Sequence, residues 1–403
     1  MKKNFKKKVL KNGMTVLFEK RNIPVVSVAF AVKQGGVNES LKEKGISHFI
    51  EHLLYKGTPT RNFRQIAEEI EKNGGIMNGF TSEEVTAYWC KMPSRHLEVA
   101  LNVLSDMIKN PLFDEKEVEK ERKVIFEEIK MYKDNPRMHV FDEMHSLMYK
   151  PPFGVPLIGT YKSMNSIARE DIVKKFKEVY SPSNLYLVVV GNANFDKIVK
   201  FVEKTFLGKK GKRPSVSKIV PKNGNKMEKR KGVDQANVAF SYHVPLAGNK
   251  KAYAAKVLST LMAEGMSSRL FAEIRAKRNL AYAIKGDSNI SKNFAYNFIY
   301  LGTTKEAVKE AKKIILAEFD KIVNSLTEKE LEEVKEQIIG NYHISMEDSQ
   351  SQMVNLLVSE IDEGEAQEYY DFPKKISAVK IKDVKDIAKK AIEKHSFYAL
   401  VPE

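Results

Sequence analysis

The chain has 403 residues, of which 42% are hydrophobic and 30% are charged. This length exceeds that of one ordinary domain and fits two of about 200 residues, and the composition excludes a disordered or fibrous chain. The single cysteine, Cys90, excludes an intrachain disulfide framework and is typical of a reducing compartment. No run of 18 apolar residues occurs, so we expect no membrane span and no membrane partner.

The formal net charge of +16 raises the hypothesis of a nucleic-acid partner. However, Lys209–Lys231 alone carries ten Lys or Arg residues against one acidic residue, in a stretch whose composition is typical of a linker. That stretch has no aromatic residue for base stacking, so we expect no nucleic-acid partner. The basic segment Met1–Lys8 is not followed by an apolar run, so we expect no signal peptide and a cytoplasmic protein.

The first half of the chain alternates short β-rich runs with helical patterns. An Asn12-Gly13 turn predicts a hairpin over residues 9–19, and the β-branched run 25–32 predicts the next strand. Further strands are expected at 74–81, 85–91 and 185–190. Apolar periodicity predicts the helices of this half at 45–54, 63–73, 94–109, 114–133, 168–179 and 194–206.

The second half repeats this order of elements, as an internal duplication does. Residues 237–242 match the strand at 25–32, a helix is expected at 251–263, and residues 397–401 match the strand at 185–190. We therefore predict an α+β fold of two similar α/β sandwich domains in tandem, each a sheet flanked by helices. The predicted parts are an N-terminal domain at 1–208, a basic linker at 209–232 and a C-terminal domain at 233–403.

The motif that carries chemistry is His48-x-x-Glu51-His52, in the helix expected at 45–54. His48 and His52 are four residues apart on one helical face, where two imidazoles can bind one zinc ion. Glu51 lies near that face, where a carboxylate could hold a water molecule. The pattern is the inverse of the commoner zinc-protease motif. The alternative, two satisfied histidines on a half-buried helix, is the weaker interpretation because of the glutamate.

A catalytic zinc ion needs a third protein ligand as well as an open position for water. In the helix expected at 114–133, Glu121 and Glu128 lie within about 60° of Ile125 on the apolar face, whereas Glu127 points to the opposite side. A carboxylate on an apolar face is costly unless it is paired or binds a metal. This favours Glu128 as the ligand, with a pairing to a nearby Arg or Lys as the alternative.

The second half does not repeat these residues. If Gly57 is matched with Gly265, other side chains stand at the positions of the three motif residues, and Asn341 stands opposite Glu128. The side chains at the motif positions are Lys256, Ser259 and Thr260. We therefore predict one metal site per chain, in the first half.

These segments resemble the pitrilysin/insulysin family of inverted-motif zinc metallopeptidases, in particular its short two-domain members similar to mitochondrial processing peptidase. The likeness is carried by residues 45–58, 75–81, 121–129 and 265–282. It implies one Zn²⁺ per chain and a processing-peptidase type of metallohydrolase fold. By resemblance the zinc ligands are His48, His52 and Glu128, the general base is Glu51, and the carboxylate supporting the ligands is Glu121.

The resemblance also implies substrate contacts. The segment Asn78, Gly79, Phe80 and Thr81 matches the edge strand on which substrate is laid, and Arg275 and Tyr282 match residues that reach the substrate near the scissile bond. Two positions depart from the family pattern. Gly79 stands where Ala is usual, which we expect to loosen the edge, and Asn279 stands where Gly is usual.

The expected function is that of a zinc-dependent endopeptidase that cleaves unfolded peptides or extended protein segments inside a chamber formed by face-to-face halves. The expected assembly is a homodimer. The rival hypothesis is a non-catalytic structural or core subunit of a larger complex, like the core proteins of the respiratory cytochrome bc complex, which resemble this fold. The intact set of His48, Glu51, His52 and Glu128 argues against it.

Overall fold

The computed structural model describes residues 4–403; residues 1–3, where the basic amino-terminal segment begins, lie outside the described residues. The described chain forms two compact units, each assembled from three separate segments. The first unit consists of residues 4–129, Pro156–Lys218 and Ser345–Tyr370. The second unit consists of Lys130–Val155, Ile219–Ile344 and Asp371–Glu403.

The first unit is built on a six-stranded mixed sheet with the strand order β1-β2-β6-β3-β5-β4, in which only β2 and β6 pair in parallel. The central strands are rich in β-branched residues and buried on both faces, which is where such strands are stable. The strands are β1 (Phe5–Val9), β2 (Thr15–Lys20), β3 (Val25–Val32), β4 (Ile76–Thr81), β5 (Thr86–Pro93) and β6 (Leu185–Gly191).

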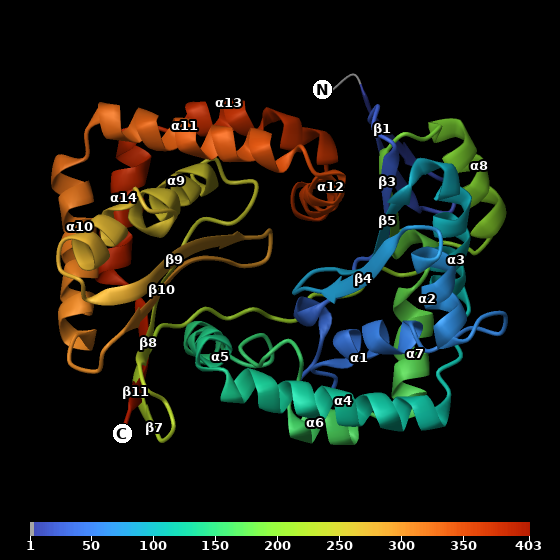
Figure 1. Cartoon of the computed structure of the whole chain (residues 1–403), viewed down its shortest axis with the longest axis horizontal. Helices are drawn as coiled ribbons and strands as arrows, with labels where there is room; N and C mark the ends of the chain where they lie inside the picture. Colours follow the sequence, from blue (N-terminus) through green and yellow to red (C-terminus); the bar gives the residue numbers. More distant parts are fainter. Residues whose placement is uncertain (1–3) are drawn as a thin grey trace. The chain divides into compact units, whose positions relative to one another are not determined.

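Helices cover both faces of this sheet (Figure 1). The long helix α4 crosses the boundary between the two units at its carboxyl end, and the other helices of the first unit lie within it. These helices are α1 (Ile46–Leu54), α2 (Phe63–Glu71), α3 (Leu97–Lys109), α4 (Glu115–Asp134), α6 (Tyr161–Ser166), α7 (Arg169–Val179), α8 (Phe195–Thr205) and α12 (Ser349–Glu363).

Helix α12 comes from the second half of the sequence but packs on the sheet of the first unit, against β3 and β6. Its side chains Leu356 and Leu357 are fully buried in a cluster with Leu17 and Val188 of the sheet. The fit is supported by polar contacts, among them a hydrogen bond from Gln352 Nε2 to Glu19 Oε2 at 2.7 Å. The core of the first unit is therefore incomplete without this helix.

The second unit has a five-stranded sheet with the order β7-β11-β8-β10-β9, in which β7 and β11 pair in parallel. Its strands are β7 (Asn225–Arg230), β8 (Ala236–His243), β9 (Ala281–Ile290), β10 (Ala295–Thr303) and β11 (Ser396–Pro402). Its helices are α5 (Pro136–Met148), α9 (Ala252–Ala263), α10 (Val308–Ser325), α11 (Glu328–Ser345), α13 (Phe372–Ser377) and α14 (Ile381–Glu393).

Two helix-flanked sheets confirm the predicted pair of similar α/β domains. The predicted hairpin is also confirmed, because β1 pairs with β2 and Gly13 adopts the positive φ of +90° that its turn requires. One expectation is wrong in part: residues 225–230, placed in the basic linker, form strand β7 and pair with β11. Helices α5 and α12 were not predicted from the sequence, and each packs on the unit built mainly from the other half of the chain.

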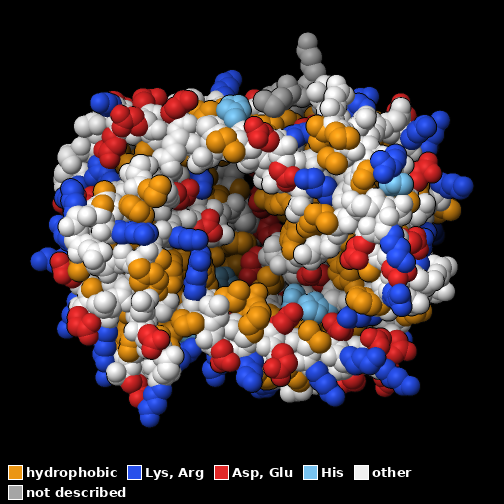
Figure 2. Space-filling model, in the orientation of Figure 1, with side chains coloured by type: hydrophobic (Ala, Val, Ile, Leu, Met, Phe, Trp, Pro, Cys, Tyr) orange, Lys and Arg blue, Asp and Glu red, His pale blue; other side chains and the backbone are white. Residues whose placement is uncertain are grey.

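Two surface properties bear on the partners considered above. Within residues 4–403, no helix has both the length and the apolar character needed to cross a membrane. On the face of the molecule shown in Figure 2, the Lys and Arg side chains are interspersed with Asp and Glu rather than gathered into one band.

Candidate metal centre

The position of helix α1 is fixed by a buried carboxylate at its amino end. Glu39 Oε1 accepts a hydrogen bond from Ser47 N at 2.8 Å, and Oε2 accepts one from Gly45 N at 3.0 Å. These bonds satisfy amides that have no partner within the helix, and a carboxylate at this end complements the helix dipole. Lys44 Nζ lies 3.7 Å from Glu39 Oε2, and both side chains are fully buried. The helix that carries the motif is thus held rigidly at its start.

The two histidines lie on one face of α1, as their spacing predicted. Phe49 and Leu53 of the same helix point into the core and are almost completely buried, whereas His48 and His52 are half-buried. The imidazole centroids of His48 and His52 are 4.5 Å apart. The helix therefore presents both rings side by side at the border of the core.

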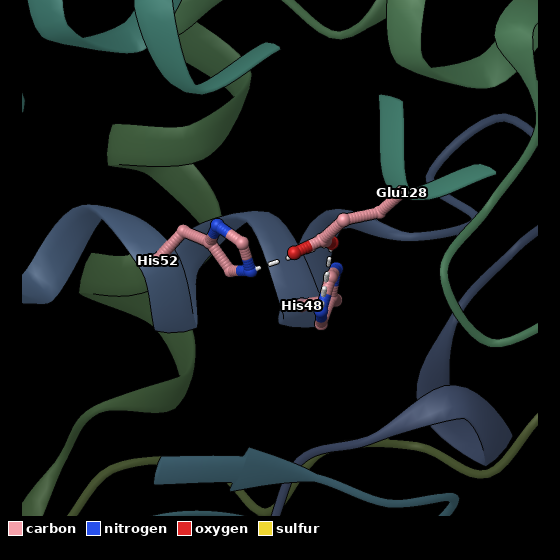
Figure 3. A group of neighbouring side chains, drawn as sticks. All are labelled: His48, His52 and Glu128. Atoms are coloured by element: carbon pink, nitrogen blue, oxygen red, sulfur yellow. Dashed lines mark ion pairs between the residues drawn. The ribbon is translucent and has the colours of Figure 1, made fainter. Parts of the chain in front are cut away.

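Helix α4 places Glu128 opposite the two rings, and Figure 3 shows its carboxylate reaching toward both of them. Glu128 Oε2 lies 3.8 Å from His48 Nε2 and 3.7 Å from His52 Nε2, and one ligand atom from each residue lies within 4.8 Å of the others. Ligands bonded at 2.0–2.1 Å to a tetrahedral zinc ion are about 3.3 Å apart, so a small contraction would form the site. Glu127 is exposed, as the helical-face argument predicted.

Of the two rings, His48 has the charge state that suits metal binding, whereas the neighbouring carboxylates favour protonation of His52. Burial and the neighbouring His52 lower the pKa of His48 to about 3, so its imidazole is neutral at pH 7. Burial also opposes protonation of His52, but the hydrogen bond to Glu121 and the charges of Glu128 and Glu51 outweigh it and raise the pKa of His52. The two imidazole nitrogens and the carboxylate oxygen of Glu128 form a ligand set that zinc accepts.

Glu121 orients the His52 ring through Nδ1, the ring nitrogen that does not face Glu128. Its Oε2 lies 3.1 Å from His52 Nδ1, so a proton on Nδ1 is bonded to the carboxylate and the lone pair of Nε2 faces Glu128. Lys56 Nζ lies 2.6 Å from the other oxygen of Glu121. Although burial raises it, these hydrogen bonds from His52 and Lys56 lower the pKa of Glu121, which keeps the carboxylate ionised. The contact fits the supporting role that the resemblance implied for Glu121, and the role itself stays a prediction.

Glu51 lies beside the candidate ligands and is buried. Its Oε2 accepts a hydrogen bond of 2.5 Å from Thr81 Oγ1. Burial raises the pKa of Glu51, and the charge of Glu128 adds to this, against the opposing effects of Thr81 and His52. A carboxyl group whose pKa is raised toward neutrality is suited to take up and release a proton.

Strand β4 is the last strand of its sheet, so its outer edge is paired with no other described strand. Gly79 and Thr81 face α1, as shown by the contact of Thr81 with Glu51, whereas Phe80 packs against the cluster that contains α12. Asn78 is exposed, and its Oδ1 accepts a hydrogen bond from Gly79 N. The position at the edge fits the predicted substrate strand; the substrate contacts themselves stay a prediction.

Arg275 and Tyr282 belong to the second unit. Arg275 is exposed, with its guanidinium 5.0 Å from the centroid of the Phe271 ring. Tyr282 is 47% exposed, and its hydroxyl is hydrogen-bonded to that of Tyr300, which in turn donates to Asn237 Oδ1 at 2.6 Å. The roles predicted for both residues therefore stay predictions.

Two family models and several curated proteins match the sequence of this chain. Residues 15–161 match the family model described as Insulinase (Peptidase family M16), and residues 166–338 match the model described as Peptidase M16 inactive domain. The chain belongs to peptidase family M16. A curated M16 relative, the uncharacterized zinc protease YmxG of Bacillus subtilis, is 31% identical over 98% of both chains. Another, an uncharacterized zinc protease of Rickettsia felis, is 34% identical over 86% of this chain and 85% of its own.

Solved structures confirm the M16 fold. A protease from Helicobacter pylori has a TM-score of 0.91 and 24% identity, covering 99% of both chains. A chain of complex III2 from Candida albicans has a TM-score of 0.87 and 16% identity, covering 98% of this chain and 95% of its own. At these identities the likeness concerns the fold alone.

The corresponding place in the second unit of this M16 protein holds no such ligand set. Lys256 Nζ lies 3.0 Å from both oxygens of Glu264, and Ser259 and Thr260 donate hydrogen bonds to the same carboxylate at 2.7 and 3.0 Å. The side chains at the motif positions thus bind a neighbouring glutamate, Glu264. This agrees with the matched description of an inactive domain.

Sequence reasoning missed several residues that build the site. Glu39 caps α1, Lys56 holds Glu121, and the role of Thr81 toward Glu51 differs from the predicted substrate contact. Lys56 lies just past the carboxyl end of α1, four residues after His52, and only this closeness in sequence gave a signal. Glu39 and Thr81 carried none, because their contacts depend on how separate segments pack.

Proposed function

We propose that this M16 family member is a zinc-dependent endopeptidase acting on unfolded peptides or extended protein segments. The observation that carries the proposal is the convergence of His48, His52 and Glu128 on one point, with the buried carboxylate of Glu51 beside them. Zinc proteases among the curated relatives, similar over nearly the whole chain, support the choice of metal.

In the proposed reaction each residue has a distinct task. Zinc bound by His48, His52 and Glu128 would supply a Lewis acid that acidifies water and polarises a peptide carbonyl. Glu51 accepts the proton of the attacking water and delivers it to the departing amine nitrogen. Glu121 keeps His52 in the tautomer and orientation that ligation requires.

The edge strand β4 accounts for the proposed substrate class. An extended peptide can pair with the free edge of a sheet, and its side chains then alternate between the two faces. A folded segment cannot offer its backbone in this way, so folded proteins should resist cleavage. Arg275 and Tyr282, the chamber of face-to-face halves and the homodimer belong to this proposal on the strength of the family resemblance.

The alternative is a non-catalytic structural or core subunit of a larger complex; the similar Candida albicans chain is part of complex III2. It is disfavoured because a structural role does not require two histidines and a glutamate to converge beside a buried base. The test measures zinc in the purified protein together with cleavage of a mixed-sequence quenched-fluorescent peptide library, with and without chelator. We expect about one zinc per chain and loss of cleavage on chelation, restored by zinc. The proposal would be refuted by cleavage that does not depend on metal, or by the absence of cleavage in protein that is fully loaded with zinc.

A matched variant separates chemistry from metal binding. Glu51→Gln removes the base but no ligand, so it should keep zinc and lose nearly all turnover. Turnover near that of the wild type would remove Glu51 from its proposed role.

A further inference from the structure

Building on the proposed function, we propose that Thr81 is a positioning residue for Glu51. Strand β4 would thereby orient the general base as well as offer its edge to the substrate. The proposal concerns residues of the first unit only, and it rests on contacts that α1, β4 and β5 make with one another.

The hydroxyl of Thr81 has two acceptors within reach, and Glu51 is the nearer. Thr81 Oγ1 lies 2.5 Å from Glu51 Oε2 and 3.4 Å from Thr86 Oγ1. Thr86 Oγ1 donates its own proton to the backbone oxygen of Gln34 at 2.9 Å, so it can only accept from Thr81. The single proton of Thr81 bonds the carboxylate, because that oxygen is much nearer and hydrogen bonds to carboxylates are the stronger ones. Oε2 of Glu51 is thus held by the Thr81 hydroxyl.

The other oxygen of Glu51 is limited by Gly79, which lies on the same face of β4 as Thr81. A Cβ atom built on Gly79 would lie 3.0 Å from Glu51 Oε1 and 3.1 Å from the backbone oxygen of Ala87. A side chain at this position would therefore crowd Oε1 and shift it by a few tenths of an ångström. Together, Thr81 and Gly79 define where both carboxylate oxygens lie.

This arrangement has a consequence for catalysis. A peptide that pairs with β4 is aligned by the strand that also holds the base, so the distance between the peptide bond and Glu51 depends on one rigid element. Displacing a catalytic group by about 1 Å can cost about 10²-fold in rate. Loss of the Thr81 hydroxyl should therefore lower kcat and leave substrate binding unchanged.

The test compares zinc-loaded full-length variants on individual peptides chosen from the library by wild-type cleavage. Thr81→Val should lower kcat by about 10- to 100-fold, with KM, zinc content and melting temperature close to those of the wild type. Thr81→Ser should restore kcat, because it keeps the hydroxyl. If the valine side chain disturbs the fold, Thr81→Ser and Thr81→Ala give the same comparison, since both lose the methyl group and only one keeps the hydroxyl. Thr60→Val is the matched control: it removes a hydroxyl bonded to Asp106 and does not contact Glu51.

Three results would overturn the proposal: wild-type kcat in Thr81→Val, a change confined to KM, or equal losses in the serine and alanine variants. Glu51→Gln, measured in parallel, separates this inference from the proposed function. If Glu51→Gln is inactive while Thr81→Val has wild-type kcat, only the positioning role fails. If Glu51→Gln stays active, the proposed role of Glu51 itself fails.

Discussion

Gly79 and Tyr55 share one small volume beside Glu51, so substitutions at the two positions should be strongly coupled. A Cβ atom on Gly79 would lie 2.7 Å from Tyr55 Oη, which is well inside van der Waals contact. The backbone oxygen of Ala87, at 3.1 Å from the same point, prevents the new methyl group from moving away. The hydroxyl of Tyr55 thus occupies the space that an alanine side chain would need. Replacing Tyr55 by Phe removes this obstacle.

The structure gives the sign and size of each change. Gly79→Ala overpacks a half-buried site, which costs about 1–3 kcal/mol. Tyr55 Oη is buried and has no hydrogen-bond partner among the described residues, so Tyr55→Phe should be neutral or stabilise by about 1 kcal/mol. The double variant exchanges a hydroxyl for a methyl group and should unfold like the wild type. The coupling free energy should therefore be about 1–3 kcal/mol.

Thermal unfolding of the four proteins in this cycle measures the coupling. For a folding unit of this size, Gly79→Ala should lower the melting temperature by about 2–10 °C, and adding Tyr55→Phe should restore it. Gly340→Ala is the control, because Gly340 lies inside helix α11 with open space around it and should gain stability. If Gly79→Ala destabilises equally with Tyr or Phe at position 55, the shared-volume argument is wrong.

Three further predictions concern the metal centre and the core. Glu128→Gln should lose zinc and Glu127→Gln should retain it, measured by metal analysis; the reverse would contradict the assignment by helical face. Because the pKa of Glu121 is lowered in the folded protein, its carboxylate stabilises the fold above its unfolded pKa of about 4.3 and loses that contribution as pH falls. In metal-free protein, Glu121→Gln should therefore reduce the fall of the melting temperature with decreasing pH. Leu357→Ala on α12 should destabilise the first unit by about 2–5 kcal/mol, measured by hydrogen exchange of β3 and β6, whereas Val358→Ala, 40% exposed, should change it by less than about 0.5 kcal/mol.

Local periodicity was enough to predict that the three candidate ligands lie together. His48 and His52 were placed together by the four-residue repeat of one helix, and Glu128 was preferred to Glu127 by the same repeat in another. The structure places Glu128 toward both rings and leaves Glu127 exposed, which agrees with that reasoning. Such contacts can be predicted from the sequence because the direction of each side chain depends only on its own helix.

Long-range packing carried no such signal. Helix α12 was not predicted, and an apolar pattern alone would not say which sheet such a helix covers; α12 covers the sheet of the first unit. Gly79 was expected to loosen the edge of the sheet. Instead, β4 pairs with β5 along its whole length, and Gly79 packs closely against Tyr55 and Glu51. A period of two residues places Gly79 and Thr81 on one face, but only the assembled unit shows what that face meets.

The two units together bear on whether the metal is needed for folding. The second unit reaches the same kind of helix-flanked sheet, although Lys256, Ser259 and Thr260 stand at the motif positions and bind Glu264. In the first unit α1 is held at its start by Glu39 and along its length by a buried apolar face, neither of which involves a metal. Structural zinc sites contribute folding energy outright, and no contact of this kind is needed to place α1. We therefore expect the first unit to fold in the absence of zinc, with the candidate metal centre carried on that fold.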